Sequence, residues 1–109
     1  MGATGIILAG GTSSRMGEDT GLVSLEGQPM VSHVIEQLKE VVDEVIVIAN
    51  NTEYQQFGFP VYADLVLGKG PVGGIYTGLV YSKTELNLCI SCDTPFVSAQ
   101  FLKWLLSQA

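Results

Sequence analysis

Four short apolar segments, separated by stretches of helical spacing, constrain the fold of this chain more than any other feature of its sequence. Each has strand length and is rich in Ile, Val or Leu; they cover residues 5–9, 44–49, 61–63 and 86–92. Strands that alternate with helices through short connections are typical of a parallel sheet covered on both faces. The sequence therefore predicts a Rossmann-like α/β fold, a three-layer α/β/α sandwich with a mostly parallel sheet and right-handed connections.

The first predicted helix begins at Pro29, because proline suits the first position of a helix, and it should run to about Val42. Its apolar residues recur at helical spacing and would share one face. They are Met30, Val31, Val34, Ile35, Leu38, Val41 and Val42. The short segment 52–57 is expected to form one further helical turn.

The second helix should begin near Pro71 and carry Ile75, Leu79 and Val80. Three glycines make it weak by propensity but suited to close packing. They are Gly73, Gly74 and Gly78. The last helix begins at Ser98, a favourable N-cap, and is expected to place four apolar residues against the sheet. These are Phe101, Leu102, Trp104 and Leu105.

A length of 109 residues accommodates one domain with a single core, spanning residues 1–109. The composition is 47% hydrophobic and 15% charged, as expected when strands are covered on both faces. The net charge of −6 provides no basic surface for a nucleic-acid backbone, which argues against a nucleic-acid partner. No apolar run approaches the roughly 20 residues of a membrane span. A cytoplasmic protein without a membrane partner is expected.

The first predicted strand leads into a loop of glycine and hydroxyl residues, 10–17, which contains Arg15, the only arginine of the chain. Glycines allow a positive φ and a close approach to a ligand, and consecutive N–H groups in such a turn attract anions. The Arg15 guanidinium adds donors in a fixed geometry for phosphate oxygens. The spacing of Gly10, Gly11 and Gly17 fits neither the dinucleotide-binding fingerprint nor the P-loop. Either another kind of phosphate-binding loop or an ordinary βα turn is predicted.

Polar residues follow each of the other predicted strands where it ends. Asn50 follows the second, Asp64 the third and Asp93 the fourth. Because ligands of parallel sheets bind beyond the carboxyl ends of the strands, these residues are expected to converge with the glycine loop on one crevice. Turn formation after a strand is the alternative interpretation of all three. Segment 68–74, which includes Lys69, is a candidate lid or base-contacting loop beside this edge.

Cys89 and Cys92 form a single C-x-x-C within an apolar run. A structural zinc site would need a second pair, and a redox pair would be expected to open a helix. Both residues are therefore expected to behave as small buried hydrophobic side chains, without a metal, redox or disulfide role.

Several motifs occur in order along the chain: LAGGTSSRMGEDTGLVSLEGQPM from Leu8, then Asn50 and Asp64, GPVGGI from Gly70 and CDTPF from Cys92. Together they resemble the molybdenum cofactor guanylyltransferases of the MobA-like nucleotidyltransferase group, over essentially the whole chain. The resemblance implies the fold of the nucleotide-diphospho-sugar transferases. It also implies transfer of GMP from GTP to the phosphate of molybdopterin, with Mg²⁺ as cofactor and pyrophosphate as product.

The resemblance assigns roles to individual residues of the first motif. Backbone groups of Leu8, Ala9, Gly10 and Gly11 would hold the guanine and the ribose. Arg15 would contact the triphosphate. Attack of one phosphate oxygen on the α-phosphorus of another phosphate needs positioning and charge neutralisation more than a protein nucleophile.

Further roles are implied for residues beyond the first motif. Asn50 and Asp64 match contacts to the guanine nucleotide. Asp93 matches the aspartate that holds Mg²⁺ between phosphate oxygens, a task suited to a hard carboxylate oxygen. Arg15 and Asp93 are thus the expected catalytic residues. Thr20 occupies a nucleotide-binding position where the family usually has lysine, so one phosphate-contacting cation is absent there.

Alternative functions remain open at this stage. The LAGG sequence favours GTP over CTP, because the related cytidylyltransferases more typically have LAAG. Thr20 and a chain shorter than family members favour a non-catalytic GTP-binding module or shortened relative, although Lys69 could substitute for the family lysine. A molybdopterin cytidylyltransferase or a sugar-phosphate or isoprenoid-precursor nucleotidyltransferase would share the fold and the metal. Without the later half of the family, exposed apolar surface is expected to cause homo-oligomers or poor solubility.

Overall fold

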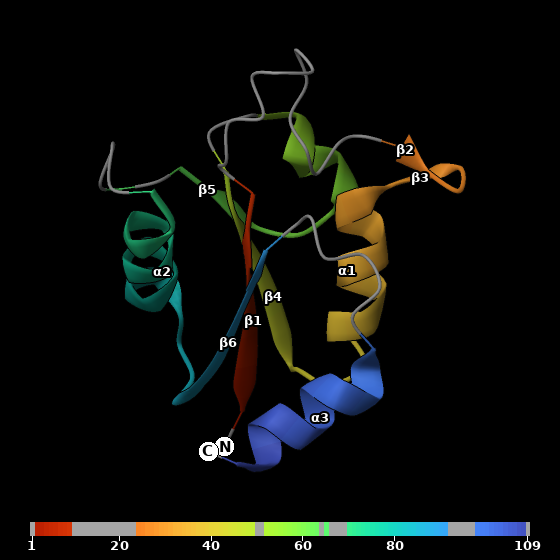
Figure 1. The fold of residues 1–109 in the computed structure, drawn as a ribbon. Coiled ribbons are helices and arrows are strands. Elements are labelled where there is room, and N and C mark those ends of the chain that lie inside the picture. Colours follow the sequence, from red (N-terminus) through yellow and green to blue (C-terminus); the bar gives the residue numbers. More distant parts are fainter. Residues whose placement is uncertain are drawn as a thin grey trace.

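A four-stranded parallel sheet forms the centre of the molecule in a computed structural model (Figure 1). The structure describes residues 2–9, 24–49, 52–63, 65, 70–91 and 98–108. The strands are β1 (Ala3–Leu8), β4 (Glu44–Ile48), β5 (Val61–Tyr62) and β6 (Leu86–Ser91). Their order across the sheet is β5-β4-β1-β6, and every neighbouring pair is parallel. The predicted parallel α/β fold is confirmed.

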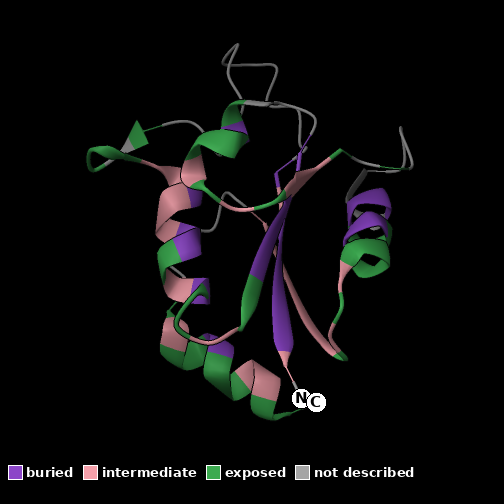
Figure 2. Cartoon of the chain, turned by 180° about the vertical axis from the view of Figure 1, so that it is seen from behind, coloured by how far each residue is buried: buried purple, intermediate pink, exposed green. Residues whose placement is uncertain are grey.

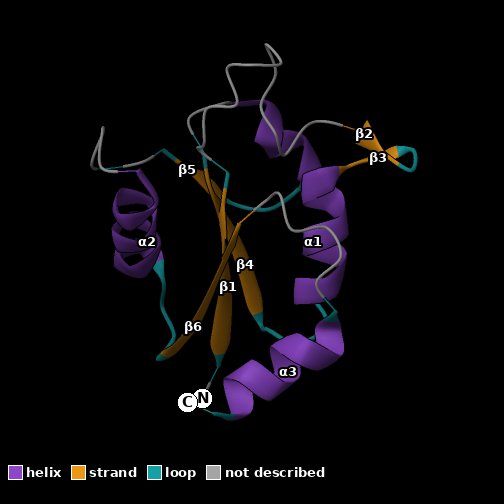
Figure 3. Cartoon of the chain, viewed as in Figure 1, coloured by secondary structure: helices purple, strands orange, loops and turns teal. Residues whose placement is uncertain are grey.

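Helices cover both faces of this sheet, which gives three layers (Figure 3). Helices α1 (Met30–Leu38) and α3 (Ala99–Ser107) lie on one face, and α2 (Gly70–Tyr81) lies on the other. Successive side chains of a strand point to opposite faces, so Ile7 packs into the core cluster under α1 whereas Ile6 packs into the cluster under α2. In the part of the chain that the structure describes, no helix has the length and apolar content to span a membrane.

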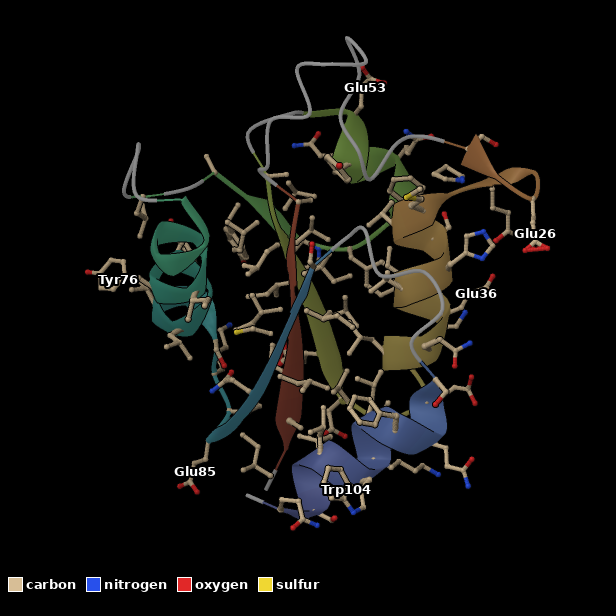
Figure 4. The ribbon with its side chains drawn as sticks, viewed as in Figure 1. Glu26, Glu36, Glu53, Tyr76, Glu85 and Trp104 are labelled. Atoms are coloured by element: carbon tan, nitrogen blue, oxygen red, sulfur yellow. The ribbon has the colours of Figure 1, made fainter. Side chains whose placement is uncertain are left out.

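Helix α2 places its small residues against the sheet and its large apolar residues outside. The buried positions are Gly73, Gly74, Thr77 and Gly78. The exposed positions are Ile75, Tyr76, Leu79 and Val80. Figure 2 shows the buried centre of the sheet, and Figure 4 shows the Tyr76 side chain pointing away from it. Close packing by the glycines is therefore confirmed, and the three large apolar residues predicted for this helix face away from the sheet.

Helix α1 is shorter than predicted, because it ends at Leu38 instead of continuing to Val42. The Val41 and Val42 N–H groups still bond to the Leu38 carbonyl, at 2.9 Å and 3.0 Å, but the chain then turns toward β4. Asp43 meets the start of β1: its N–H donates to the Ala3 carbonyl at 2.9 Å, and its carboxylate accepts from the Ala3 N–H at 2.9 Å. These two bonds explain why the helix stops before Val42.

Helix α3 buries fewer apolar residues than predicted. Leu102 is buried and Leu105 packs against the same core, but Phe101 and Trp104 are exposed, the latter by 56%. The rings of Phe101 and Trp104 stack on each other instead, with centroids 6.2 Å apart. An α-helix has 3.6 residues per turn, so neighbouring residues point in different directions. Leu102 and Leu105 therefore lie on one side of α3, and Phe101 and Trp104 lie on another. The prediction that all four face the sheet was wrong.

A small antiparallel hairpin, β2 (Ser24–Leu25) with β3 (Gln28–Pro29), precedes α1 and was not predicted. Its two turn residues, Glu26 and Gly27, have φ values of 53° and 84°. Positive φ at both central residues is the requirement of a type I′ turn. Glu26 is exposed, in keeping with the short polar turn.

Replacing Gly78 by alanine is expected to destabilise the protein by about 1–3 kcal/mol, because overpacking a core has this cost. An added Cβ would lie 2.5 Å from Ile6 Cγ2, and Ile6 is fully buried. Gly74→Ala is the matched control on the same helix, since its Cβ would lie 3.1 Å from the end of the partly buried Leu8 side chain. There the better helix propensity of alanine, about 1 kcal/mol, should offset the contact. Urea unfolding measures both variants, and equal stabilities would contradict the close approach.

Self-association is expected as the protein concentration rises, because α2 presents contiguous apolar side chains to solvent. Light scattering coupled to gel filtration should show species above 11.6 kDa. Tyr76→Glu combined with Leu79→Lys should shift the population toward the monomer, whereas Glu36→Gln on the exposed side of α1 should not. A monodisperse monomer of the unchanged chain would show the expectation to be wrong.

Candidate functional site

The four parallel strands end in one row across the sheet. Their last residues are Leu8, Ile48, Tyr62 and Ser91. Leu8 is the register partner of both Ile48 and Ser91, and Ile48 is the partner of Tyr62. The carboxyl edge of the sheet is therefore flush, with no strand projecting beyond its neighbours.

Backbone pairing continues one residue beyond this row. The Ala9 N–H donates to the Ile48 carbonyl at 2.9 Å, and the Ala49 N–H donates to the Tyr62 carbonyl at 3.0 Å. Ala9 is fully buried in the core cluster. Since its side chain and its N–H are both engaged, a ligand contact by Ala9 would use the carbonyl oxygen.

Four of the predicted site positions stand at the same distance in sequence from this row. Gly10, Asn50, Asp64 and Asp93 each come two residues after the last residue of a strand. Of the nine predicted nucleotide-binding residues, the structure describes Leu8 and Ala9, which it places side by side at the end of β1. The others lie outside the described residues: Gly10, Gly11, Arg15, Thr20, Asn50, Asp64 and Asp93.

The direction of winding changes between β1 and β6. From β1 the chain proceeds through α1 to β4 and on to β5 on one side of β1. It then crosses the other face of the sheet through α2 and adds β6 on the opposite side of β1. A ligand crevice in such sheets lies at this switch point, outside the carboxyl ends of the strands. The candidate ligand site of this sheet is therefore the edge beyond Leu8 and Ser91.

Two residues near this edge were not recognised from the sequence. Tyr54, on the 3₁₀ helix η3 (Thr52–Phe57), is fully buried and shares a core cluster with Ala9 and Ala49. Thr77, on α2, is also fully buried, and its hydroxyl is bonded to the segment that follows β5. Only the tertiary structure identifies these two residues, since neither belongs to a recognisable motif.

Among the described residues there is no group of three or more His, Cys, Asp or Glu side chains that could hold a metal ion. Cys89 is half-buried and packs against the cluster of Ile6, Ile46 and Ile48, as expected for a small hydrophobic side chain. Burial raises the pKa of the Cys89 thiol. Cys92 lies outside the described residues.

The described part of the chain defines a doubly wound parallel α/β domain whose switch point lies between β1 and β6, an architecture found in many nucleotide-binding proteins. Sequence comparison identifies the family within this class: the model of the MobA-like NTP transferase domain matches residues 5–109. The chain belongs to this family.

Curated relatives carry more specific names. A probable molybdenum cofactor guanylyltransferase of Flavobacterium johnsoniae is 42% identical over 105 residues, which cover 96% of this chain and 55% of the relative. The molybdenum cofactor guanylyltransferase of Yersinia pestis is 40% identical over 106 residues, covering 94% of this chain and 54% of the relative. The chain thus spans about half the length of these relatives.

A solved structure with the same fold is a CMP:2-keto-3-deoxy-manno-octonic acid synthetase in complex with CTP. It superposes with a TM-score of 0.86 at 22% identity, covering 99% of this chain and 47% of that chain. At this identity the likeness concerns the fold alone, and it confirms the Rossmann-like fold of the nucleotide-sugar transferases.

In a Cys92→Ser variant, the remaining Cys89 is expected to react with a thiol reagent more slowly in native buffer than in urea. Its raised pKa lowers the thiolate fraction at neutral pH, and its packing limits access. The native rate should increase as the pH rises, because the thiolate is the reacting form. With dithiobis(nitrobenzoate) as the reagent, the absorbance of the released thionitrobenzoate measures the reaction rate. Equal rates in buffer and in urea would argue for a reactive, exposed thiol.

Proposed function

We propose that this chain transfers GMP from GTP to the phosphate of molybdopterin, with release of pyrophosphate, in the formation of the guanine dinucleotide form of the molybdenum cofactor. The names of the curated relatives support this activity. The single observation that carries the proposal is the flush row of strand ends, with Gly10, Asn50, Asp64 and Asp93 each two residues beyond it.

The covalent chain limits how far such positions can be from one another. Two residues of extended chain span about 7 Å, and neighbouring strands lie about 4.8 Å apart. Residues that leave adjacent strands at the same level can therefore contact one small ligand, whereas strands of unequal length would separate them. This argument supports a shared nucleotide site at the carboxyl edge.

The proposed chemistry is an in-line displacement at phosphorus. An oxygen of the molybdopterin phosphate forms a bond to the α-phosphorus of GTP while the bond from the α-phosphorus to the pyrophosphate oxygen breaks. The protein has to align these groups and neutralise their negative charge. Arg15 is the proposed donor to the triphosphate, with a guanidinium geometry that fits phosphate oxygens.

The nucleotide itself would be held by the remaining residues of the family motifs. The backbone of Leu8, Ala9, Gly10 and Gly11 is proposed to bind the guanine and the ribose. Further contacts to the nucleotide are proposed for three residues: Thr20, Asn50 and Asp64.

Asp93 is the proposed protein ligand of Mg²⁺. Mg²⁺ is usually held by one or two carboxylates together with phosphate oxygens of the substrate, so that one aspartate after β6 fits this requirement. The cation would neutralise charge on the triphosphate and on the departing pyrophosphate. Asp93, which follows β6 by two residues in the sequence, would hold this cation.

Nucleotide binding without catalysis is the second candidate function, and Thr20 favours it. A lysine at this position would supply a charged donor to phosphate, which threonine does not. Loss of such a charged bond costs about 2 kcal/mol. Lys69 is the proposed substitute, since it directly precedes α2, which begins at Gly70.

The proposal predicts that the chain binds GTP with Mg²⁺ and prefers it to CTP, as isothermal titration calorimetry would measure. Asp93→Asn should weaken GTP binding in Mg²⁺ by about 30-fold, the equivalent of about 2 kcal/mol. Asp43→Asn is the matched control: this aspartate lies at the start of β4, at the opposite edge of the sheet, and asparagine can still accept the Ala3 N–H bond. Its GTP affinity should be unchanged.

Pyrophosphate release in the presence of GTP, Mg²⁺ and molybdopterin then tests catalysis. Binding with release supports the guanylyltransferase, and binding without release supports the non-catalytic module. Tighter binding of CTP would assign the chain to the cytidylyltransferases, and turnover with a sugar phosphate or an isoprenoid precursor to the corresponding transferases. Absence of binding to either nucleotide would contradict the proposal.

A further inference from the structure

Thr4 and Thr77 are the polar side chains that the described part of the chain buries almost completely, at 1% and 0% exposure. A buried hydroxyl is costly unless it is hydrogen-bonded. Thr4 lies on β1 and shares a hydrogen bond of 2.7 Å with the Thr84 hydroxyl, near the amino edge of the sheet. Thr77 lies on the sheet-facing side of α2, between Gly74 and Gly78, and its partners are different.

The Thr77 hydroxyl connects α2 to the segment that precedes it. It donates its proton to the Gly73 carbonyl at 2.9 Å and accepts the Leu65 N–H at 2.9 Å. A hydroxyl has one proton, so the carbonyl and the N–H define the direction of both bonds. The Leu65 side chain is 51% exposed, so its burial cannot account for the position of Leu65. The hydrogen bond from its backbone N–H supplies a fixed connection.

The hydrogen bond from Leu65 to Thr77 lies directly after a proposed site residue in the sequence. The Leu65 N–H belongs to the peptide group that joins Leu65 to Asp64, and such a group is planar. The bond to Thr77 therefore anchors the backbone of Leu65, the residue that directly follows the proposed nucleotide contact Asp64 in the sequence. Asp64 itself, a proposed nucleotide contact, lies outside the described residues.

The other end of the connection is rigidly supported by the sheet. Helix α2 approaches β1 so closely that an added Cβ at Gly74 would lie 3.1 Å from Leu8, and one at Gly78 would lie 2.5 Å from Ile6. Thr77 is therefore held at a fixed height above β1, whose last residue belongs to the row of strand ends. Functional groups bind best when supporting contacts fix them in advance.

We propose that Thr77 is a positioning residue for nucleotide binding, whose hydroxyl anchors the backbone N–H of Leu65 next in sequence to the proposed nucleotide contact Asp64. The inference rests on the proposed function, because it assumes a nucleotide at the carboxyl edge. It adds a residue of α2 to the site and assigns it no contact with the substrate.

The test compares Thr77→Val, which removes the hydroxyl at nearly constant volume, with Thr77→Ser, which retains it. Thr77→Val should weaken GTP binding in Mg²⁺ by about tenfold, as expected for the loss of one hydrogen bond. Thr77→Ser should restore the affinity of the unchanged chain. Calorimetry measures the affinities, and urea unfolding of each variant measures the stabilities.

Thr4→Val is the matched control, because it also removes a fully buried hydroxyl and its hydrogen bond, but at the other edge of the sheet. It should lower the urea midpoint as Thr77→Val does and leave the GTP affinity within about twofold. If Thr77→Val binds GTP as the unchanged chain does, or if Thr4→Val loses as much affinity, the inference is overturned. If the unchanged chain binds neither GTP nor CTP, the proposed function itself fails, and the nucleotide role of Thr77 fails with it.

Should Thr77→Val not fold, Thr77→Ala provides the same comparison, because alanine favours the helix and also lacks the hydroxyl. Amide hydrogen exchange at Leu65 gives a readout that does not depend on nucleotide. The Leu65 N–H should exchange faster in Thr77→Ala than in Thr77→Ser. Equal exchange in the two variants would overturn the proposed anchor.

Discussion

Parallel pairing of β1 with both of its neighbours is the interaction on which the rest of the structure depends. β1 pairs with β4 on one side and with β6 on the other, and its side chains alternate between the two core clusters. A slip of one residue in either register would exchange the faces of Ile6 and Ile7. It would also displace Leu8 from the row of strand ends, so that core packing and site geometry are set by the same hydrogen bonds.

The elements that the sequence predicted well are those whose signal is local. The apolar strand segments and the N-cap at Ser98 depend on residues close together in the chain, and the structure has them within a few residues of the expected bounds. The orientation of helices depends on distant partners. Nothing in the sequence around Trp104 shows that Leu102 and Leu105 occupy the sheet-facing side of α3, and the end of α1 depends on bonds between Asp43 and Ala3.

The candidate site likewise has features that the sequence predicts and features that only the structure provides. The positions of Asn50, Asp64 and Asp93 after strands could be read from the sequence, because the covalent chain fixes which residues follow a strand. The equal offset from the row required the register of the sheet, which only the structure provides. Thr77 could not be predicted as a site residue from the sequence, because its proposed positioning role depends on a hydrogen bond to Leu65, twelve residues earlier in the chain.

The place of Trp104 has a practical consequence for spectroscopy. It is the only tryptophan of the chain, and it lies on α3 at the end of the molecule remote from the carboxyl edge of the strands (Figure 4). Its indole is more than half exposed and stacks on Phe101. Intrinsic tryptophan emission will therefore report the local structure of α3, and events at the opposite edge of the sheet will need an optical label of their own.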